Sequence, residues 1–207
     1  MESMHRVIIG DASEMSEVDR GSIDLVVTSP PYPMIEMWDD VFAAADPSIA
    51  SALAACDSRK AFECLHRILD KVWKELQRVV KPGGMVCINI GDATRTVDGD
   101  FELFANHARV IAAFVSRGFT QLPSILWRKP TNAPNKFMGS GMLPAGAYVT
   151  LEHEYILIFR LNGKRLFDSD ADKMKRRQSA FFWEERNEWF SDVWFDLRGA
   201  SQRLNNA

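Results

Sequence analysis

Short apolar runs and longer amphipathic stretches alternate along this chain and predict an α/β fold. Residues 25–27 are three consecutive β-formers, which suits a strand buried on both faces. The strand is expected to end at Thr28 or Ser29, because the two prolines that follow cannot donate to a sheet ladder. Open α/β sheets place their ligands in the loops at such carboxyl ends. Residues 29–32 therefore predict a stiff binding loop.

The same patterns predict the remaining elements. Apolar residues at three- and four-residue spacing indicate helices, and runs of β-branched residues indicate strands. The two last strands are expected to pair antiparallel across a long loop. We expect a short helix or a helical turn at residues 13–18, helices at residues 59–80 and 101–117, and strands at residues 7–9, 85–90, 119–128 and 151–160.

Residues 33–58 show no clear period and contain Trp38 with two methionines, Met34 and Met37. These side chains suit packing against the core or a mobile loop that closes over a ligand. The sequence leaves both possibilities open.

Composition limits the classes of protein. The 207 residues suffice for one domain, or for one domain with an appendage, and a net charge of −3 gives no overall attraction to a polyanion. Any contact with nucleic acid must therefore use a local basic surface. Three cysteines without C-x-x-C spacing indicate neither a disulfide framework nor a zinc site. The sequence has no apolar stretch of membrane-spanning length, so a cytoplasmic location is expected.

Two stretches resemble one enzyme family. Ser29-Pro30-Pro31-Tyr32, after a hydrophobic strand, resembles motif IV of the DNA amino methyltransferases, which transfer a methyl group from S-adenosyl-L-methionine to the exocyclic nitrogen of cytosine or adenine. The alternative is a proline-rich strand exit with a packed tyrosine. The sequence from Trp127 to Pro130, followed by a strand from His153, is similar to motif VIII and its partner strand. The resemblance implies a Rossmann-like methyltransferase fold with a mixed sheet.

The resemblance gives the loop its roles. The Ser29 hydroxyl and the Pro30 carbonyl would accept the N–H protons of the target amine, Pro31 would stiffen the loop, and Tyr32 would stack on the flipped base. Serine at the first position favours N4 of cytosine over N6 of adenine. The four residues are thus the expected catalytic set, and double-stranded DNA is the expected substrate.

The cofactor site is expected to be incomplete. By resemblance, Asp11 and Thr28 would bind S-adenosyl-L-methionine, although Asp11 equally suits a turn or helix cap. The family's glycine-rich loop, which resembles D-P-F-x-G-x-G, does not occur in this sequence. The motif order matches the β arrangement, in which that loop comes last. We therefore expect a fold that lacks its first two strands, with an exposed edge at the first strand. A second polypeptide is expected to supply the cofactor half of an enzyme inactive without it, either because the enzyme is naturally split or because these residues are one piece of a longer chain.

The composition changes after residue 161, which predicts a methyltransferase region at 1–161 and a target-recognition-like segment at 162–207. Basic residues beside aromatic ones suit a nucleic-acid surface. The alternative is a solvated charged loop with aromatic residues packed on the domain. The expected DNA-binding residues are Trp127, Lys129, Lys164, Arg165, Lys175, Arg176 and Arg177.

Other functions remain open. The chain could be a non-catalytic DNA-binding subunit or a degenerate methyltransferase relative, or it could methylate RNA or a protein glutamine, although Asn in place of Ser29 is more usual there. His153 and Glu154 look like an acid/base pair, but adjacent strand residues point to opposite faces, so we expect structural roles for both.

Overall fold

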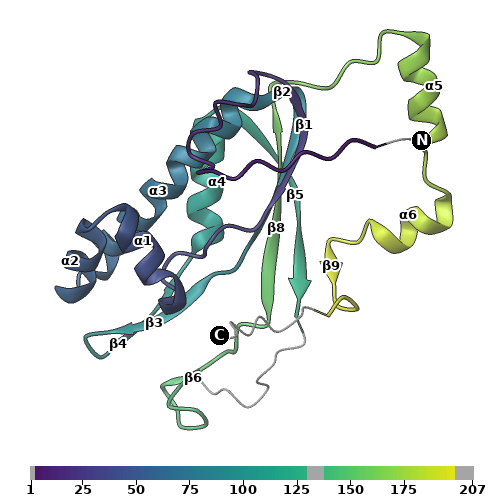
Figure 1. Ribbon diagram of the computed structural model, residues 1–207. Coiled ribbons are helices and arrows are strands. Elements are labelled where there is room, and N and C mark those ends of the chain that lie inside the picture. Colours follow the sequence, from purple (N-terminus) through teal and green to yellow (C-terminus); the bar gives the residue numbers. More distant parts are fainter. Residues whose placement is uncertain (1–2, 130–137, 199–207) are drawn as a thin grey trace.

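The computed structural model describes residues 3–129 and 138–198, which are built around one five-stranded sheet (Figure 1). The strand order is β1-β2-β8-β5-β9. β1 and β2 are parallel, β8 is antiparallel to both β2 and β5, and β9 is parallel to β5, so the sheet is mixed as expected. The strands are β1 (Ile23–Thr28), β2 (Val80–Ile90), β5 (Phe119–Arg128), β8 (His153–Leu161) and β9 (Val193–Trp194).

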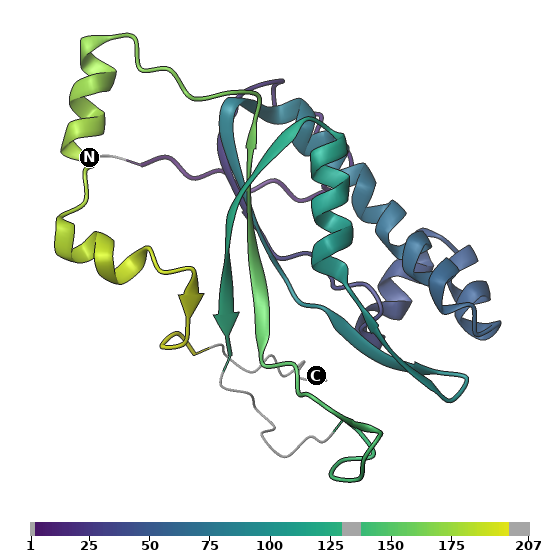
Figure 2. The same ribbon diagram turned by 180° about the vertical axis from the view of Figure 1, so that it is seen from behind.

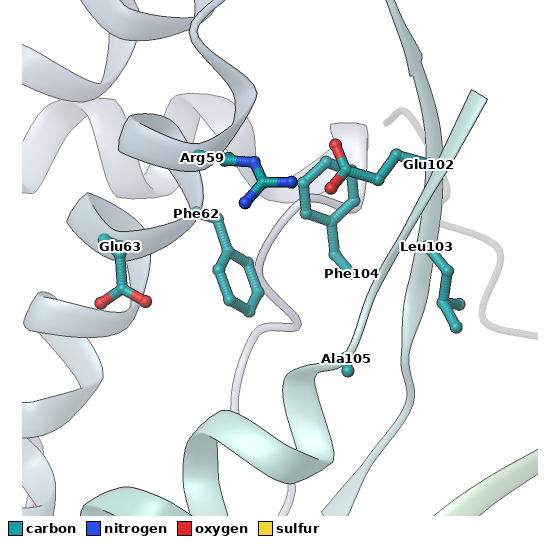
Figure 3. A pocket seen from close by; sticks show the side chains of 7 residues that line it. All are labelled: Arg59, Phe62, Glu63, Glu102, Leu103, Phe104 and Ala105. Carbon is teal, nitrogen blue, oxygen red and sulfur yellow. The ribbon is translucent and has the colours of Figure 1, made fainter. Parts of the chain in front are cut away.

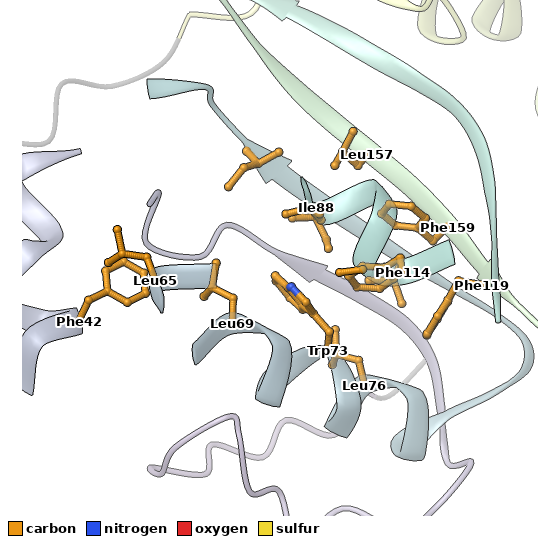
Figure 4. Close-up of a cluster of buried hydrophobic side chains, with 14 of the residues drawn as sticks. Phe42, Leu65, Leu69, Trp73, Leu76, Ile88, Phe114, Phe119, Leu157 and Phe159 are labelled. Carbon is orange, nitrogen blue, oxygen red and sulfur yellow. The ribbon is translucent and has the colours of Figure 1, made fainter. Parts of the chain in front are cut away.

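Two long helices cover one face of this sheet (Figure 2). They are α3 (Ser58–Val79) and α4 (Asn106–Ser116). Between the helices and the sheet lies the core, where Trp73 packs against Phe114 and Phe114 stacks on Phe159 at 4.3 Å (Figure 4). The period of three and four residues along α3 correctly predicted that Leu65, Leu69, Leu76 and Val79 are buried. It did not include Trp73 and His66, which are also buried.

Residues 33–58 are more regular than the sequence indicated. They contain the 3-10 turn η1 (Glu36–Trp38) and the helices α1 (Asp39–Ala45) and α2 (Ser48–Ala54). Met34 is fully buried and Trp38 packs against the core. Of the two possibilities left open for this segment, core packing is confirmed for these two side chains.

The expected strand at residues 7–9 is wrong. The chain there is exposed and belongs to none of the described ladders, since a strand requires a neighbour to pair with. Of the two possibilities predicted for residues 13–18, the structure shows turns and no helix. They are closed by hydrogen bonds from the Glu14 amide to the Asp11 carbonyl and from the Val18 amide to the Met15 carbonyl.

The expected helix at 101–117 begins too early. Its first residues belong to a hairpin of β3 (Ala93–Val97) and β4 (Asp100–Phe104), and only α4 is helical. The turn uses Asp98 at φ 51° and Gly99 at φ 85°. An Asp-Gly pair with positive φ at both residues is a strong hairpin signal, which the apolar spacing masked.

The expectation that β1 is buried on both faces is also wrong. Val26 faces the helices, but Leu25 and Val27 on the other face are 56% and 74% exposed. β1 forms an edge of the sheet, and no described helix lies against these two side chains. An apolar edge strand of this kind matches the exposed edge that the sequence predicted.

The segment 162–198, called the C-terminal arm below, lies across the sheet from α3 and α4 (Figures 1 and 2). It contains α5 (Asp170–Gln178) and α6 (Trp183–Trp189) and returns to the sheet through β9. A two-stranded ladder of β6 (Met138–Gly139) and β7 (Ala147–Tyr148) precedes β8. Among the described helices, none has the length and apolar character needed to cross a membrane.

Candidate active site

The loop after β1 is tied to the ends of two neighbouring strands by the Tyr32 hydroxyl. Asn89, near the end of β2, donates from Nδ2 to this hydroxyl at 2.8 Å, and the hydroxyl donates to Oε2 of Glu154 on β8 at 2.9 Å. Ser29 Oγ lies 3.2 Å from the same hydroxyl. Ser29 itself is exposed, so its hydroxyl can meet a ligand while Tyr32 holds the loop.

Glu154 joins this loop to the end of β5. Its Oε1 accepts from Lys129 Nζ at 2.5 Å, and Lys129 also lies over the Trp127 ring at 4.3 Å from the ring centre. Two of the predicted DNA-binding residues are thereby connected to Tyr32 through one carboxylate.

A second network fixes the loop from inside the core. Buried Asn106 donates from Nδ2 to the carbonyls of Pro33 and Gly91, each at 3.0 Å, and its Oδ1 lies 3.0 Å from Nε2 of buried His66. A Cβ atom at Gly91 would lie 3.0 Å from the Tyr32 ring, so any larger residue there would press against the ring. Asn106 therefore joins the backbone directly after Tyr32 to the backbone at Gly91, beside the Tyr32 ring.

Burial governs the protonation of two groups in these networks. It raises the pKa of the Tyr32 phenol above its ordinary value, so the hydroxyl keeps its hydrogen at neutral pH. It lowers the pKa of His66 to about 4, so this imidazole is neutral in the folded protein.

Beside Gly91, Asp92 accepts hydrogen bonds from the backbone amide of His107 at 3.0 Å and from its Nδ1 at 2.8 Å. The His107 ring stacks on Tyr155 at 4.0 Å. Asp92 also lines a cleft of about 840 Å³ between the β3-β4 hairpin and the segments around Met34 and Met138. Residues 29–32 do not line this cleft themselves, but Met34, which follows the loop, and Asp92, which follows β2, do.

A smaller cleft of about 370 Å³ lies between α3 and β4, with Arg59 and Phe62 facing Glu102 and Phe104 (Figure 3). No residue of the Ser29 loop lines it. It is therefore separate from the candidate site.

Asp11 is not brought to this loop by any described contact. Its carboxylate accepts from the Ser13 amide at 2.8 Å, and that hydrogen bond is the main reason its pKa is lowered. It lines a shallow pocket formed only by residues 6–18. Thr28, the other expected cofactor residue, is the last residue of β1 and directly precedes Ser29.

The predicted basic residues fall into separate places. Arg165 pairs with Asp24 at 3.1 Å, at the opposite end of β1 from Ser29, and Lys164 is its exposed neighbour. Lys175, Arg176 and Arg177 are exposed in the last turn of α5. Only Lys129 and Trp127 lie beside the loop. Pro130 and the end of the predicted recognition segment, residues 199–207, lie outside the described residues.

Sequence reasoning missed Asn89, Asn106 and the part that Glu154 plays in this site. Asn106 carries no recognisable motif. Glu154 was assigned a structural role because only its strand alternation was considered, although Trp127 is its direct partner in the β5-β8 register. Pairing the two motif-like strands in that register would have placed Glu154 beside Lys129.

Comparison with known proteins identifies relatives for nearly the whole chain. A family model described as "DNA methylase" matches residues 23–206. Type II methyltransferase M.MthZI of Methanothermobacter thermautotrophicus is 54% identical over all 207 residues, and M.MjaI of Methanocaldococcus jannaschii is 47% identical over 201 residues, 92% of this chain. A putative DNA modification methylase from Thermus thermophilus, solved in complex with S-adenosyl-L-methionine, is 28% identical with a TM-score of 0.71 and covers 95% of this chain.

These relatives are longer than the chain. It spans 58% of M.MthZI, 66% of M.MjaI and 68% of the Thermus structure. The additional length of each relative lies within a single polypeptide, so the comparisons give no support to the expected second polypeptide.

Proposed function

The chain belongs to the DNA methylase family, whose model matches residues 23–206, and on that premise we propose that it holds the target base during transfer of a methyl group to an exocyclic amine of DNA. The observation that carries the proposal is the exposed Ser29 hydroxyl on a loop whose Tyr32 is fixed by Asn89 and Glu154. A fixed acceptor beside an aromatic ring suits a flat base with a polar edge.

In this proposal, Ser29 and the Pro30 carbonyl accept the N–H protons of the amine, while Pro31 keeps the loop rigid. Accepting these protons draws the nitrogen lone pair toward the methyl group and orients it for attack. Positioning of this kind contributes on the order of 7 kcal/mol or more. The Tyr32 ring stacks on the base, which must leave the duplex to reach the loop. Serine at position 29 favours cytosine N4 as the target.

S-adenosyl-L-methionine supplies the electrophilic methyl group. In this proposal Thr28, directly before Ser29, offers a hydroxyl toward this ligand. Asp11 remains a candidate only by resemblance, because no described contact brings it to the loop, and no glycine-rich cradle is present in the sequence. We propose that the missing cradle and the strands that pair with β1 come from residues outside these 207. The exposed Leu25 and Val27 on the edge strand support this proposal.

The C-terminal arm is proposed to contact double-stranded DNA and to form a segment distinct from residues 1–161. Its support is the group of exposed cations at the end of α5 beside exposed aromatic residues. Lys164 and Arg165 are included in this surface, and Lys129 and Trp127 lie where a base reaching the loop would pass.

The test uses a reconstituted enzyme. By this we mean the full-length protein that contains these 207 residues, mixed with the product of any neighbouring gene that encodes a glycine-rich cofactor loop. Duplex DNA is incubated with labelled S-adenosyl-L-methionine, digested to nucleosides and analysed by mass spectrometry. We expect N4-methylcytosine. Labelled N6-methyladenine would correct the target, and no methylated nucleoside from a folded enzyme would contradict the function.

The incomplete cofactor site has its own test. Calorimetric titration of the isolated 207-residue chain with S-adenosyl-L-methionine should show no binding at micromolar concentration. Micromolar affinity would show that the described residues suffice and would overturn that part of the proposal.

A non-catalytic DNA-binding subunit is the second candidate, favoured by the absent glycine loop. It predicts DNA binding by the reconstituted enzyme without any methyl transfer.

A further inference from the structure

Hydrogen atoms in the Tyr32 network have a single consistent arrangement, and the Asn89 amide sets it. Nδ2 of Asn89 lies 2.7 Å from Oε2 of Glu154 and 2.8 Å from the Tyr32 hydroxyl. The reverse orientation would place the amide oxygen against a carboxylate oxygen, and both would be acceptors. Asn89 therefore uses both N–H groups, one toward Glu154 and one toward Tyr32.

The Tyr32 hydroxyl has one hydrogen to give. Its oxygen already accepts from Asn89, and the carboxylate of Glu154 at 2.9 Å can only accept, so the hydrogen is directed to Glu154. Ser29 Oγ, 3.2 Å from the same oxygen, must then act as the donor. The Ser29 hydrogen points into the protein, and its lone pairs point away from Tyr32.

Lys129 completes this arrangement on the other side of the carboxylate. Its ammonium donates to Oε1, so both carboxylate oxygens of Glu154 accept hydrogen bonds. Because burial raises the pKa of Tyr32, the phenol retains the hydrogen that the chain of bonds requires.

We infer that Glu154 is a positioning residue that fixes the direction of the Ser29 hydroxyl, so that Ser29 presents acceptor lone pairs to the N–H of the target amine. The inference rests on the proposed function and assigns a role to a residue that does not itself touch the base. A Ser29 hydroxyl turned the other way would offer a hydrogen to the amine and oppose the geometry needed for transfer.

Glu154→Gln tests this role at nearly constant shape. One amide cannot accept from Lys129 on one side and from both Tyr32 and Asn89 on the other, so the order of hydrogen bonds is lost. In the reconstituted enzyme we expect kcat to fall about 10- to 100-fold, with KM for DNA within about threefold of the wild type. The matched control is Glu152→Gln. Glu152 lies two residues before Glu154, and its exposed carboxylate pairs with Arg128, so this change should leave kcat and KM unchanged.

A double-mutant cycle separates positioning from general damage. Tyr32→Phe keeps the ring but removes the hydroxyl through which Glu154 acts on Ser29. If the inference holds, the double variant Glu154→Gln/Tyr32→Phe loses no more activity than the worse single variant, because both break one chain. Independent losses that multiply would overturn the inference.

The NMR signal of Tyr32 tests the same hydrogen bonds without any methyl transfer. The sequence has three tyrosines, so the ring ¹³Cζ signal of Tyr32 can be assigned in labelled protein. We expect this signal to move in Glu154→Gln and to stay in Glu152→Gln. If the wild type is active and Glu154→Gln is equally active, the inference fails but the proposed function stands. If the wild type itself transfers no methyl group, the proposed function fails and the inference fails with it.

Discussion

The described part of residues 3–161, called the body below, and the C-terminal arm differ in how far their side chains are buried. In the body, Trp73, Phe114 and Phe159 pack against one another, and the polar pair His66 and Asn106 is buried and joined by a hydrogen bond. In the arm, none of the described residues 162–198 is buried, and aromatic side chains such as Trp183, 69% exposed, face solvent.

This contrast separates two tasks that the proposed enzyme must perform. Holding an amine for attack requires fixed atoms, and the Ser29 loop is fixed from Asn89, Glu154 and Asn106. Contact with a long charged duplex requires accessible cations and aromatic faces, which the arm displays. We therefore expect the arm to contribute little to stability and most of the electrostatic attraction to DNA, with Lys129 as the contribution of the body.

The largest expected difference between the two regions concerns stability. Trp73→Ala empties a core position and should lower the free energy of unfolding by about 3 to 5 kcal/mol. Trp183→Ala, the matched change in the arm, should lower it by less than about 0.5 kcal/mol. Urea unfolding followed by circular dichroism measures both. Equal losses would show that the arm is packed as firmly as the body.

Acid should weaken the body through His66. Its folded pKa of about 4 lies below that of an unfolded histidine, so the unfolded chain binds the extra proton between about pH 6.5 and 4. Stability should therefore be fully present above about pH 6.5 and fall by about 2 to 3 kcal/mol as the pH drops to about 4. His66→Gln, which does not titrate, should reduce that slope. An unchanged slope in this variant would place the acid sensitivity elsewhere.

Removing the basic residues at the end of α5 should affect DNA binding but not folding. Replacing Lys175, Arg176 and Arg177 together by Ala should leave the unfolding free energy unchanged. It should weaken DNA binding and reduce the slope of log K against log salt by about 3. Fluorescence anisotropy at several salt concentrations measures this slope. A slope equal to that of the wild type would mean that these three residues contact no phosphates.

The sequence was informative wherever one local signal dominated. The prolines after Thr28 ended β1 where expected, and the apolar period of α3 predicted its buried face. It failed where tertiary pairing decides. Residues 7–9 have β-branched side chains but no described ladder, and the Asp98-Gly99 turn converted the start of a predicted helix into a hairpin.

The site was predictable only in part for the same reason. Ser29 and Tyr32 are recognisable because their motif is continuous in sequence. Asn89 and Glu154 reach them from strands 57 and 122 residues away from Tyr32, so their role depends on the register of three strands. Asn106 holds the loop through backbone carbonyls, which leave no trace in residue types.

The central claim is that Ser29 orients the target amine after DNA has bound. Its most direct test is the single-turnover rate of methyl transfer on prebound duplex DNA by the reconstituted enzyme carrying Ser29→Ala, with Ser116→Ala on the exposed end of α4 as the control. We expect the rate to fall about 100-fold in Ser29→Ala, with DNA affinity and the control unchanged. A Ser29→Ala rate equal to that of the wild type would contradict the account.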